Sequence, residues 1–178
     1  MKSYSFNTDE MKNYALSLQA GDRVLLSGTV YTARDAAHKR IMSIIEEGGE
    51  LPFDIEGAVI YYAGPTPAPE GKAIGSCGPT TSCRMDPYTP HLLDMGLAAT
   101  VGKGDRSQDV IDAVVRNGSV YLCAIGGAGA LAAESVVSCD VIAFDDLGCE
   151  SVKKLEIKDF PLVVAIDSNG CCLKGGKK

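Results

Sequence analysis

The sequence predicts an α/β domain with a mixed β-sheet flanked by helices, and three observations lead to this prediction. Apolar runs rich in β-branched residues alternate along the chain with segments whose apolar residues recur at helical spacing. Glycines and prolines separate many of these segments. The chain has 178 residues, of which 46% are hydrophobic and 22% charged, as expected for one globular domain with its own core.

The first half of the chain is expected to alternate between helices and strands. A helix over 7–18 starts with the capping sequence NTDE. The run RVLLSGTVYT at 23–32 is rich in strand-forming residues. In 33–47, Ala37 and Ile41 lie at helical spacing, and Gly48 ends the predicted helix. There follow a strand over 58–63, a loop with three prolines over 64–71, a turn over 75–85 and a helix over 87–95.

The second half is expected to continue the alternation. The predicted elements are a strand over 97–101, a helix over 108–116, a strand over 119–125, a helix over 129–136, a strand over 137–144, and two closing strands over 152–157 and 162–166. Residues 1–170 are therefore interpreted as a single domain and 171–178 as a C-terminal tail.

Composition and charge narrow the class of protein. The net charge of −6 argues against a nucleic-acid binder, although it leaves room for a local basic pocket that binds a small anion. No apolar leader and no membrane-spanning run is visible, so a soluble, cytoplasmic protein is expected. The seven cysteines are odd in number and include no C-x-x-C pair, which argues against a disulfide framework or a zinc site. Most of these thiols are expected to be small buried residues.

The segment TARDAAHKR at 32–40 is the first candidate for chemistry. Asp35 is predicted to lie near a helix start, where a carboxylate is favoured. Arg34 and His38 are four residues apart and should share a helix face, which could hold a carboxylate. The alternative is a solvated basic amphipathic helix.

The segment GSCGPTTSCRMD at 75–86 is the second candidate. Thr80, Thr81 and Ser82 carry hydroxyls suited to a helix N-terminus, and Arg84 follows, so together they could cradle an anion. A capped helix with an ordinary surface arginine is the alternative. Lys103 lies between two glycines after a predicted strand, which makes it closely approachable, but alone this is a weak signal.

A glycine-rich segment, IGGAGALAA at 125–133, matches a loose dinucleotide-binding pattern after a strand. Too little chain follows it for a complete dinucleotide fold, so a tight strand-to-helix turn is the preferred interpretation. His91, in a predicted helix among apolar neighbours, is expected to be structural.

Taken together and in order, the segments SGTVYTARDAAHKRI, YYAGPTPAPEGKAIGSCGPTTSCRMD, TVGKGD and IGGAGALAA resemble the β subunit, or C-terminal domain, of class I fumarate hydratases and the related L-tartrate dehydratase β subunits. The resemblance runs from about residue 8 to 170. It implies a swivelling β/β/α fold and a hydro-lyase of the tricarboxylic acid cycle that converts fumarate to L-malate. It also implies an α2β2 hetero-oligomer whose α subunit, rather than this chain, holds a [4Fe–4S] cluster on three cysteines.

The resemblance further implies roles for individual residues. Arg34, Arg84 and Lys103 would bind the substrate carboxylates, and Thr80 would move the proton at C3, either as the base or as a relay. His38, Asp35 and Thr81 would support the site, while no metal ligand is assigned to this chain. Cys83 departs from the small or variable residue expected at its position. L(+)-tartrate remains the alternative substrate, and a non-catalytic anion-binding domain or a nucleotide-binding module the alternative classes of function.

Overall fold

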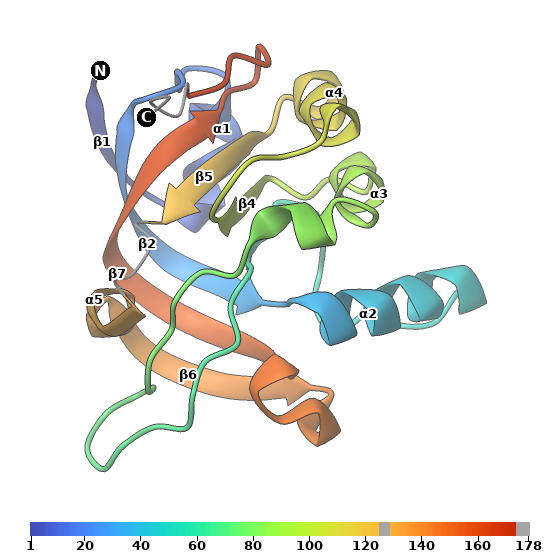
Figure 1. Ribbon diagram of the computed structural model, residues 1–178, viewed down its shortest axis with the longest axis vertical. Helices are drawn as coiled ribbons and strands as arrows, with labels where there is room; N and C mark the ends of the chain where they lie inside the picture. The colour runs from blue at the N-terminus through green and yellow to red at the C-terminus, as the bar shows by residue number, and fades with distance from the viewer. Residues whose placement is uncertain (125–128, 174–178) are drawn as a thin grey trace.

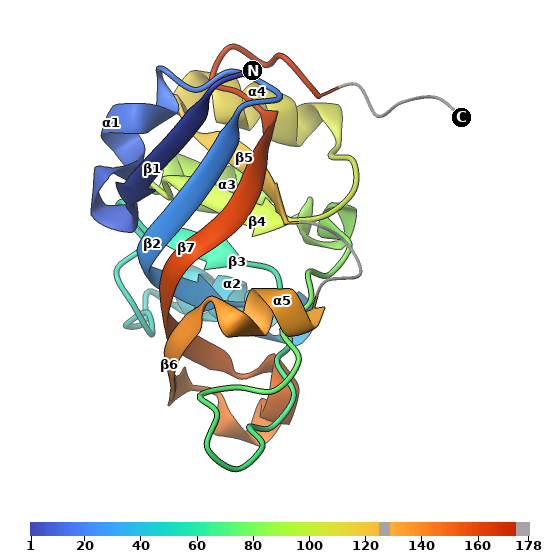
Figure 2. The same ribbon diagram turned by 90° about the vertical axis from the view of Figure 1, so that its left-hand side faces the viewer.

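The computed structural model describes residues 1–124 and 129–173. Across these ranges the chain forms one seven-stranded sheet in the order β1-β2-β3-β4-β5-β7-β6, with an additional pairing of β2 and β7. Figures 1 and 2 show the sheet as a strongly curved wall, with several helices packed along one side of it. The strands are β1 (Ser3–Asn7), β2 (Arg23–Thr32), β3 (Val59–Tyr61), β4 (Ala99–Gly102), β5 (Val120–Ala124), β6 (Val136–Ala143) and β7 (Val152–Ile166).

The predicted mixed sheet is confirmed. The structure also shows that part of this sheet closes on itself, which the sequence analysis did not predict. Strands β1 to β5 pair in parallel, whereas β7 runs antiparallel to β2, β5 and β6. Since β7 pairs with both β2 and β5, strands β2, β3, β4, β5 and β7 close on themselves like a small barrel. The long β7 makes this possible because its two halves have different second neighbours, β6 and β5.

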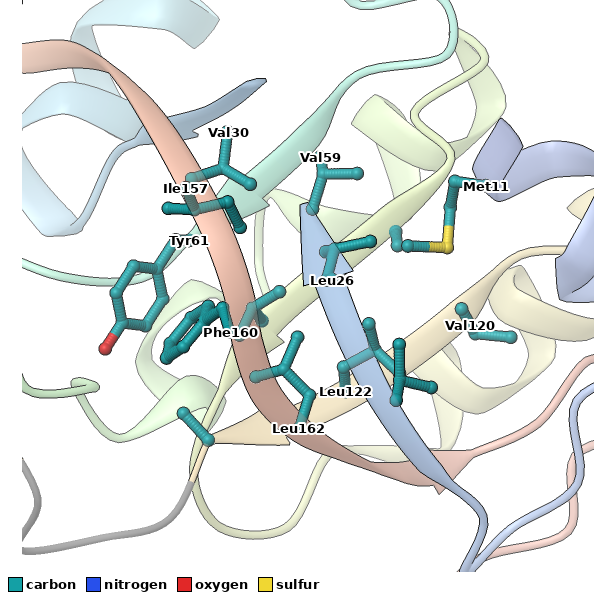
Figure 3. Close-up of a cluster of buried hydrophobic side chains, with 14 of the residues drawn as sticks. Met11, Leu26, Val30, Val59, Tyr61, Val120, Leu122, Ile157, Phe160 and Leu162 are labelled. Carbon is teal, nitrogen blue, oxygen red and sulfur yellow. The ribbon is translucent and has the colours of Figure 1, made fainter. Parts of the chain in front are cut away.

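The inside of the closed sheet is filled by one of two hydrophobic clusters. Alternate strand residues point inward, among them Tyr61 of β3, Leu122 of β5 and Leu162 of β7. Figure 3 shows these side chains together with Met11 from α1 (Met11–Ala15). The short helix α1 therefore contributes to the interior rather than to the outer layer.

The second cluster lies between the outside of the sheet and the helices α2 (Asp35–Glu47), α3 (Thr89–Asp94) and α4 (Gln108–Asn117). Ile60 of β3 and Tyr62, which directly follows that strand, face this layer. Apolar positions at helical spacing, including Ile41 and Val114, are buried there. The remaining elements are α5 (Gly129–Glu134) and the 3₁₀ helices η1 (Thr8–Glu10), η2 (Ser82–Met85) and η3 (Asp145–Glu150).

Two sequence-based assignments of strands were wrong. The strand β1 was missed, and the two predicted closing strands are one continuous β7. A β-bulge explains the second error: the register between β2 and β7 shifts between Leu26 and Gly28, and Asp159 adopts a left-handed φ of 50°. The Asp159 N–H donates to Ser27 Oγ at 3.0 Å, so the strand absorbs the irregularity and continues.

The prediction about the thiols was also wrong. All seven are free, but Cys77 alone among them is buried, whereas Cys83, Cys149, Cys171 and Cys172 are exposed. In the described part of the chain, no helix has both the length and the apolar character needed to cross a bilayer.

Candidate functional site

The predicted site residues gather where parallel strands end. Arg34 and Asp35 follow β2, Thr80 lies in the loop that leaves β3, and Lys103 follows β4. Strands β2, β3 and β4 are neighbours and pair in parallel, so their carboxyl ends meet at one edge of the sheet. Figure 1 shows η2 and the start of α2 at this edge.

Arg34 lies just before α2 in extended backbone conformation. Its Nη2 is 3.4 Å from Glu150 Oε1, and its Nε is 3.7 Å from Asp35 Oδ2. Gly64 makes room for it, because a Cβ there would lie 2.7 Å from Arg34 Nη1. Arg34 Nε is buried and has no hydrogen-bond partner among the described residues, so this donor is unused.

Asp35 links the two arginines predicted to bind substrate. Arg84 Nε donates to Asp35 Oδ1 at 2.9 Å, and Nη2 donates to Oδ2 at 2.6 Å, which is the two-point geometry that arginine forms with a carboxylate. Arg84, Asp35, Arg34 and Glu150 therefore form a row of alternating charges. Both members of the Arg84–Asp35 pair are partly exposed, so a carboxylate from solvent can reach the row.

Backbone contacts hold the Thr80 loop against Lys103. The Thr80 N–H donates to the Tyr62 carbonyl at 2.6 Å, and Thr81 forms an isolated parallel bridge with Lys103. The Ser82 N–H donates to the Lys103 carbonyl at 2.9 Å, and the Lys103 N–H donates to Ser82 Oγ at 3.0 Å. These bonds keep the backbones of Thr80 and Lys103 in fixed register beside Arg84.

The expected anion cradle at a helix N-terminus is corrected in two respects. The helix η2 has only four residues, and no side chain caps it. Ser82 is fully buried, and its hydroxyl accepts hydrogen bonds from the Lys103 N–H and, at 2.9 Å, from Tyr121 OH. Ser82 is thus a structural residue, and the groups left for a ligand at this loop are Thr80, Thr81 and Arg84.

His38 does not share an exposed face with Arg34, which corrects the sequence interpretation. It is fully buried, stacks on Tyr88, and places Nδ1 3.0 Å from the Arg34 carbonyl. Because the carbonyl can only accept, Nδ1 carries the proton. Burial lowers the pKa of His38 to about 4, with a smaller contribution from the Arg106 charge, although the bond to Arg34 opposes the shift. The neutral imidazole therefore supports the backbone of Arg34 from below.

The free energy of unfolding should therefore fall as the pH is lowered, because the folded chain disfavours the protonated form of His38. The unfolded chain binds this proton near the ordinary pKa of 6.5, whereas the folded chain resists it down to about 4. Between pH 7 and pH 5, the free energy of unfolding should drop by about 2 kcal/mol through this residue. Urea unfolding at both pH values measures the drop. His38→Gln should flatten this dependence, whereas the exposed His91→Gln should keep it; equal slopes for wild type and His38→Gln would contradict the argument.

Two residues that contact the candidate site or its loops were missed by the sequence analysis. Glu150 reaches the site from η3, and the Ala36 N–H donates to its Oε2 at 2.9 Å across 114 positions of sequence. No local pattern could have revealed that contact. Arg106 is buried and donates to Asp86 Oδ1 at 2.7 Å, two residues beyond Arg84. An arginine and an aspartate near two basic loops were visible in the sequence, but their pairing was not.

The glycine-rich segment lies partly outside the described residues, which resume at Gly129. The Gly129 carbonyl accepts from the Cys77 N–H at 3.1 Å, so the start of α5 lies against the loop that precedes Thr80. Within the described ranges, no three His, Cys, Asp or Glu side chains are grouped as metal ligands would be.

Two arginines, a lysine and a threonine therefore lie at one edge of the sheet and form the candidate site. The chain belongs to the family described as Fumarase C-terminus, whose model matches residues 1–173. It is 42% identical over 164 residues to "Fumarate hydratase 2" of Leishmania major, covering 91% of this chain and 29% of that protein. It is 42% identical over 150 residues to "Fumarate hydratase class I, anaerobic" of Escherichia coli (strain K12), covering 83% and 27%.

A further relative is of similar length to this chain. The chain is 40% identical over 173 residues to the "Putative L(+)-tartrate dehydratase subunit beta" of Methanocaldococcus jannaschii, covering 94% of this chain and 88% of that protein. The resemblance inferred from the motifs is thus confirmed. The chain spans less than a third of the length of the two fumarate hydratases it matches.

Proposed function

We propose that this chain is the substrate-anchoring and proton-transfer subunit of a hydro-lyase that interconverts fumarate and L-malate. The observation that carries the proposal is the Arg34–Asp35–Arg84 arrangement beside Thr80 and Lys103. Fumarate and malate are dianions, so a site with several cationic side chains suits their two carboxylates. The similarity to class I fumarate hydratases supports this choice of substrate.

Each cation has a distinct part in the proposal. Arg34 and Arg84 hold one carboxylate with the donors that Asp35 and Glu150 leave free, and Lys103 contacts the other. As the proton leaves C3, negative charge develops on the adjacent carboxylate, and positive groups already in place stabilise it. Thr80 moves the proton at C3. Its hydroxyl is a very weak acid, so a relay through Thr80 and an alkoxide stabilised by Arg84 are both chemically possible.

The iron–sulfur cluster is proposed to belong to a partner α subunit in a hetero-oligomer. One observation supports a divided site: the chain matches nearly the full length of a relative named as a β subunit. That relative also keeps L(+)-tartrate as the second candidate substrate.

Anaerobic reconstitution with the cluster-bearing chain of the same organism tests the function. We expect the reconstituted complex to hydrate fumarate and the isolated chain to be inactive. L(+)-tartrate dehydration, assayed in parallel, distinguishes the second candidate. Turnover by the isolated chain would contradict the divided site, and a loaded complex that acts on neither substrate would contradict the proposed function.

A further inference from the structure

Glu150 is the one carboxylate outside the predicted motifs that contacts a proposed substrate-binding residue in the described structure. It ends η3, more than a hundred positions from Arg34 in sequence. Its two oxygens do different things: Oε1 faces Arg34 Nη2 at 3.4 Å, and Oε2 accepts from the Ala36 N–H at 2.9 Å. One carboxylate therefore fastens both the side chain of Arg34 and the first turn of α2. Figure 1 shows η3 beside this end of α2.

The bond to Ala36 makes Glu150 a long-range cap. Arg34 occupies the N-cap position of α2 but provides no side-chain cap. A carboxylate at a helix start satisfies a free N–H and interacts favourably with the helix dipole. Through this contact, the backbone that carries Arg34 is tied to η3.

The base of η3 is itself held firmly. The Lys153 ammonium is buried and donates to the carbonyl of Gly148 at 3.0 Å and to Ser151 Oγ at 2.6 Å. It also lies 3.3 Å from the Cys149 carbonyl. These bonds surround position 150 on both sides in sequence. Glu150 is thus presented from a fixed backbone rather than from a mobile loop.

The Arg34 guanidinium is confined from three directions. Glu150 faces Nη2, Asp35 lies beyond Nε, and the bare Cα of Gly64 lies against Nη1. The side chain is half-buried, and its Nε donor is unused among the described residues. Holding a long side chain in place before the ligand arrives reduces the entropy lost on binding.

We propose that Glu150 is a positioning residue, which fixes the Arg34 guanidinium for a substrate carboxylate. This inference rests on the proposed function. Glu150 can affect the binding of substrate in two ways, and these have opposite signs. As a charge, Glu150 opposes the binding of a dianion, and removing it should tighten binding. As a positioning group, it pre-orders Arg34, and removing it should weaken binding.

Glu150→Gln separates the two effects in the reconstituted complex. The amide keeps an oxygen for the Ala36 N–H and loses only the charge that faces Arg34. We expect the KM for fumarate to rise about tenfold, the size expected for losing a bond between charged groups, with kcat changed less than about threefold. The matched control is Asp146→Asn, which removes a charge from the same 3₁₀ helix at an exposed pair with Arg40 and should leave both constants unchanged.

A double variant tests whether Glu150 acts through Arg34. In an Arg34→Lys background, Glu150→Gln should raise KM little further, because the group it positions is already gone. Glu150→Asp, which keeps the charge but is shorter, should be intermediate, and it replaces Glu150→Gln as the test if that variant fails to fold. A lowered or unchanged KM in the single variant, or full additivity with Arg34→Lys, would overturn the inference. If the wild-type complex itself is inactive, the proposed function fails instead.

Discussion

Thr80→Ala is expected to lower kcat of the reconstituted complex by about a thousandfold while changing KM less than about threefold. A side chain that transfers a proton in the transition state contributes on the order of 10² to 10⁴ in rate. The position of Thr80 is set by its backbone, because its N–H donates to the Tyr62 carbonyl and Pro79 pairs with Ala63. Removing the hydroxyl therefore leaves the loop in place, and the loss should appear in the chemical step.

Steady-state assays of fumarate hydration measure both constants. Thr80→Ser keeps a hydroxyl and should recover most of the rate. The control for removing a hydroxyl from a neighbouring loop is Ser107→Ala, because Ser107 is exposed and its side chain caps no helix. A Thr80→Ala complex that retains more than a tenth of the wild-type kcat would rule out a proton-transfer role.

The fold could be predicted where local pattern and tertiary structure agree. The strand β2 has the predicted limits, Arg23–Thr32, and α2 ends at Glu47 as predicted, because Gly48 adopts the left-handed conformation that ends helices. The closure of the sheet was not predictable in the same way. It depends on the pairing of β7 with both β2 and β5, which is set by residues far apart in sequence. The bulge at Asp159 resembles a turn when only neighbouring residues are considered.

The candidate site, like the fold, was predictable only in part. Arg34, Thr80, Arg84 and Lys103 were grouped through their motifs and the family resemblance, and the parallel pairing of β2, β3 and β4 brings the segments that carry them to one edge of the sheet. Their partners could not be predicted. Ser82 looked like a ligand-binding hydroxyl but is used up by Lys103 and Tyr121. Hydrogen-bond partners across the fold decide which polar residues remain free, and sequence spacing carries no information about them.

The buried pair Arg106–Asp86 leads to the largest stability effect that we expect. The Arg106 side chain is 0% exposed, and that of Asp86 is 11% exposed. Arg106 donates to Asp86 Oδ1 at 2.7 Å, to Thr89 Oγ1 at 2.7 Å and to Thr100 Oγ1 at 3.2 Å, and it lies over the ring of Tyr121. Each of the three guanidinium nitrogens of Arg106 has a hydrogen-bond partner, which compensates for the loss of water around it. The cost of removing Arg106 is therefore determined by the buried partners that lose their hydrogen bonds.

Arg106→Met is expected to lower the free energy of unfolding by about 3 to 5 kcal/mol, because it leaves the Asp86 carboxylate partly buried without its counter-charge. Urea unfolding at constant pH measures the loss. Arg116→Met also removes an arginine–aspartate pair, with Asp94, but at an exposed position, and it should cost at most about 1 kcal/mol. Similar losses in the two variants would contradict the argument from burial.

The same pair connects stability to the proposed site. Asp86 lies two residues after Arg84, and Arg106 three residues after Lys103, so the ion pair joins the two loops that carry these cations. Asp86 also accepts from the Ser107 N–H at 2.7 Å, which adds a second link between the loops. Arg106→Met should therefore raise the KM of the reconstituted complex even at temperatures where the variant is folded, whereas Arg116→Met should not. An unchanged KM in a folded Arg106→Met complex would mean that the backbone bridge between Thr81 and Lys103 is enough to hold the loops together.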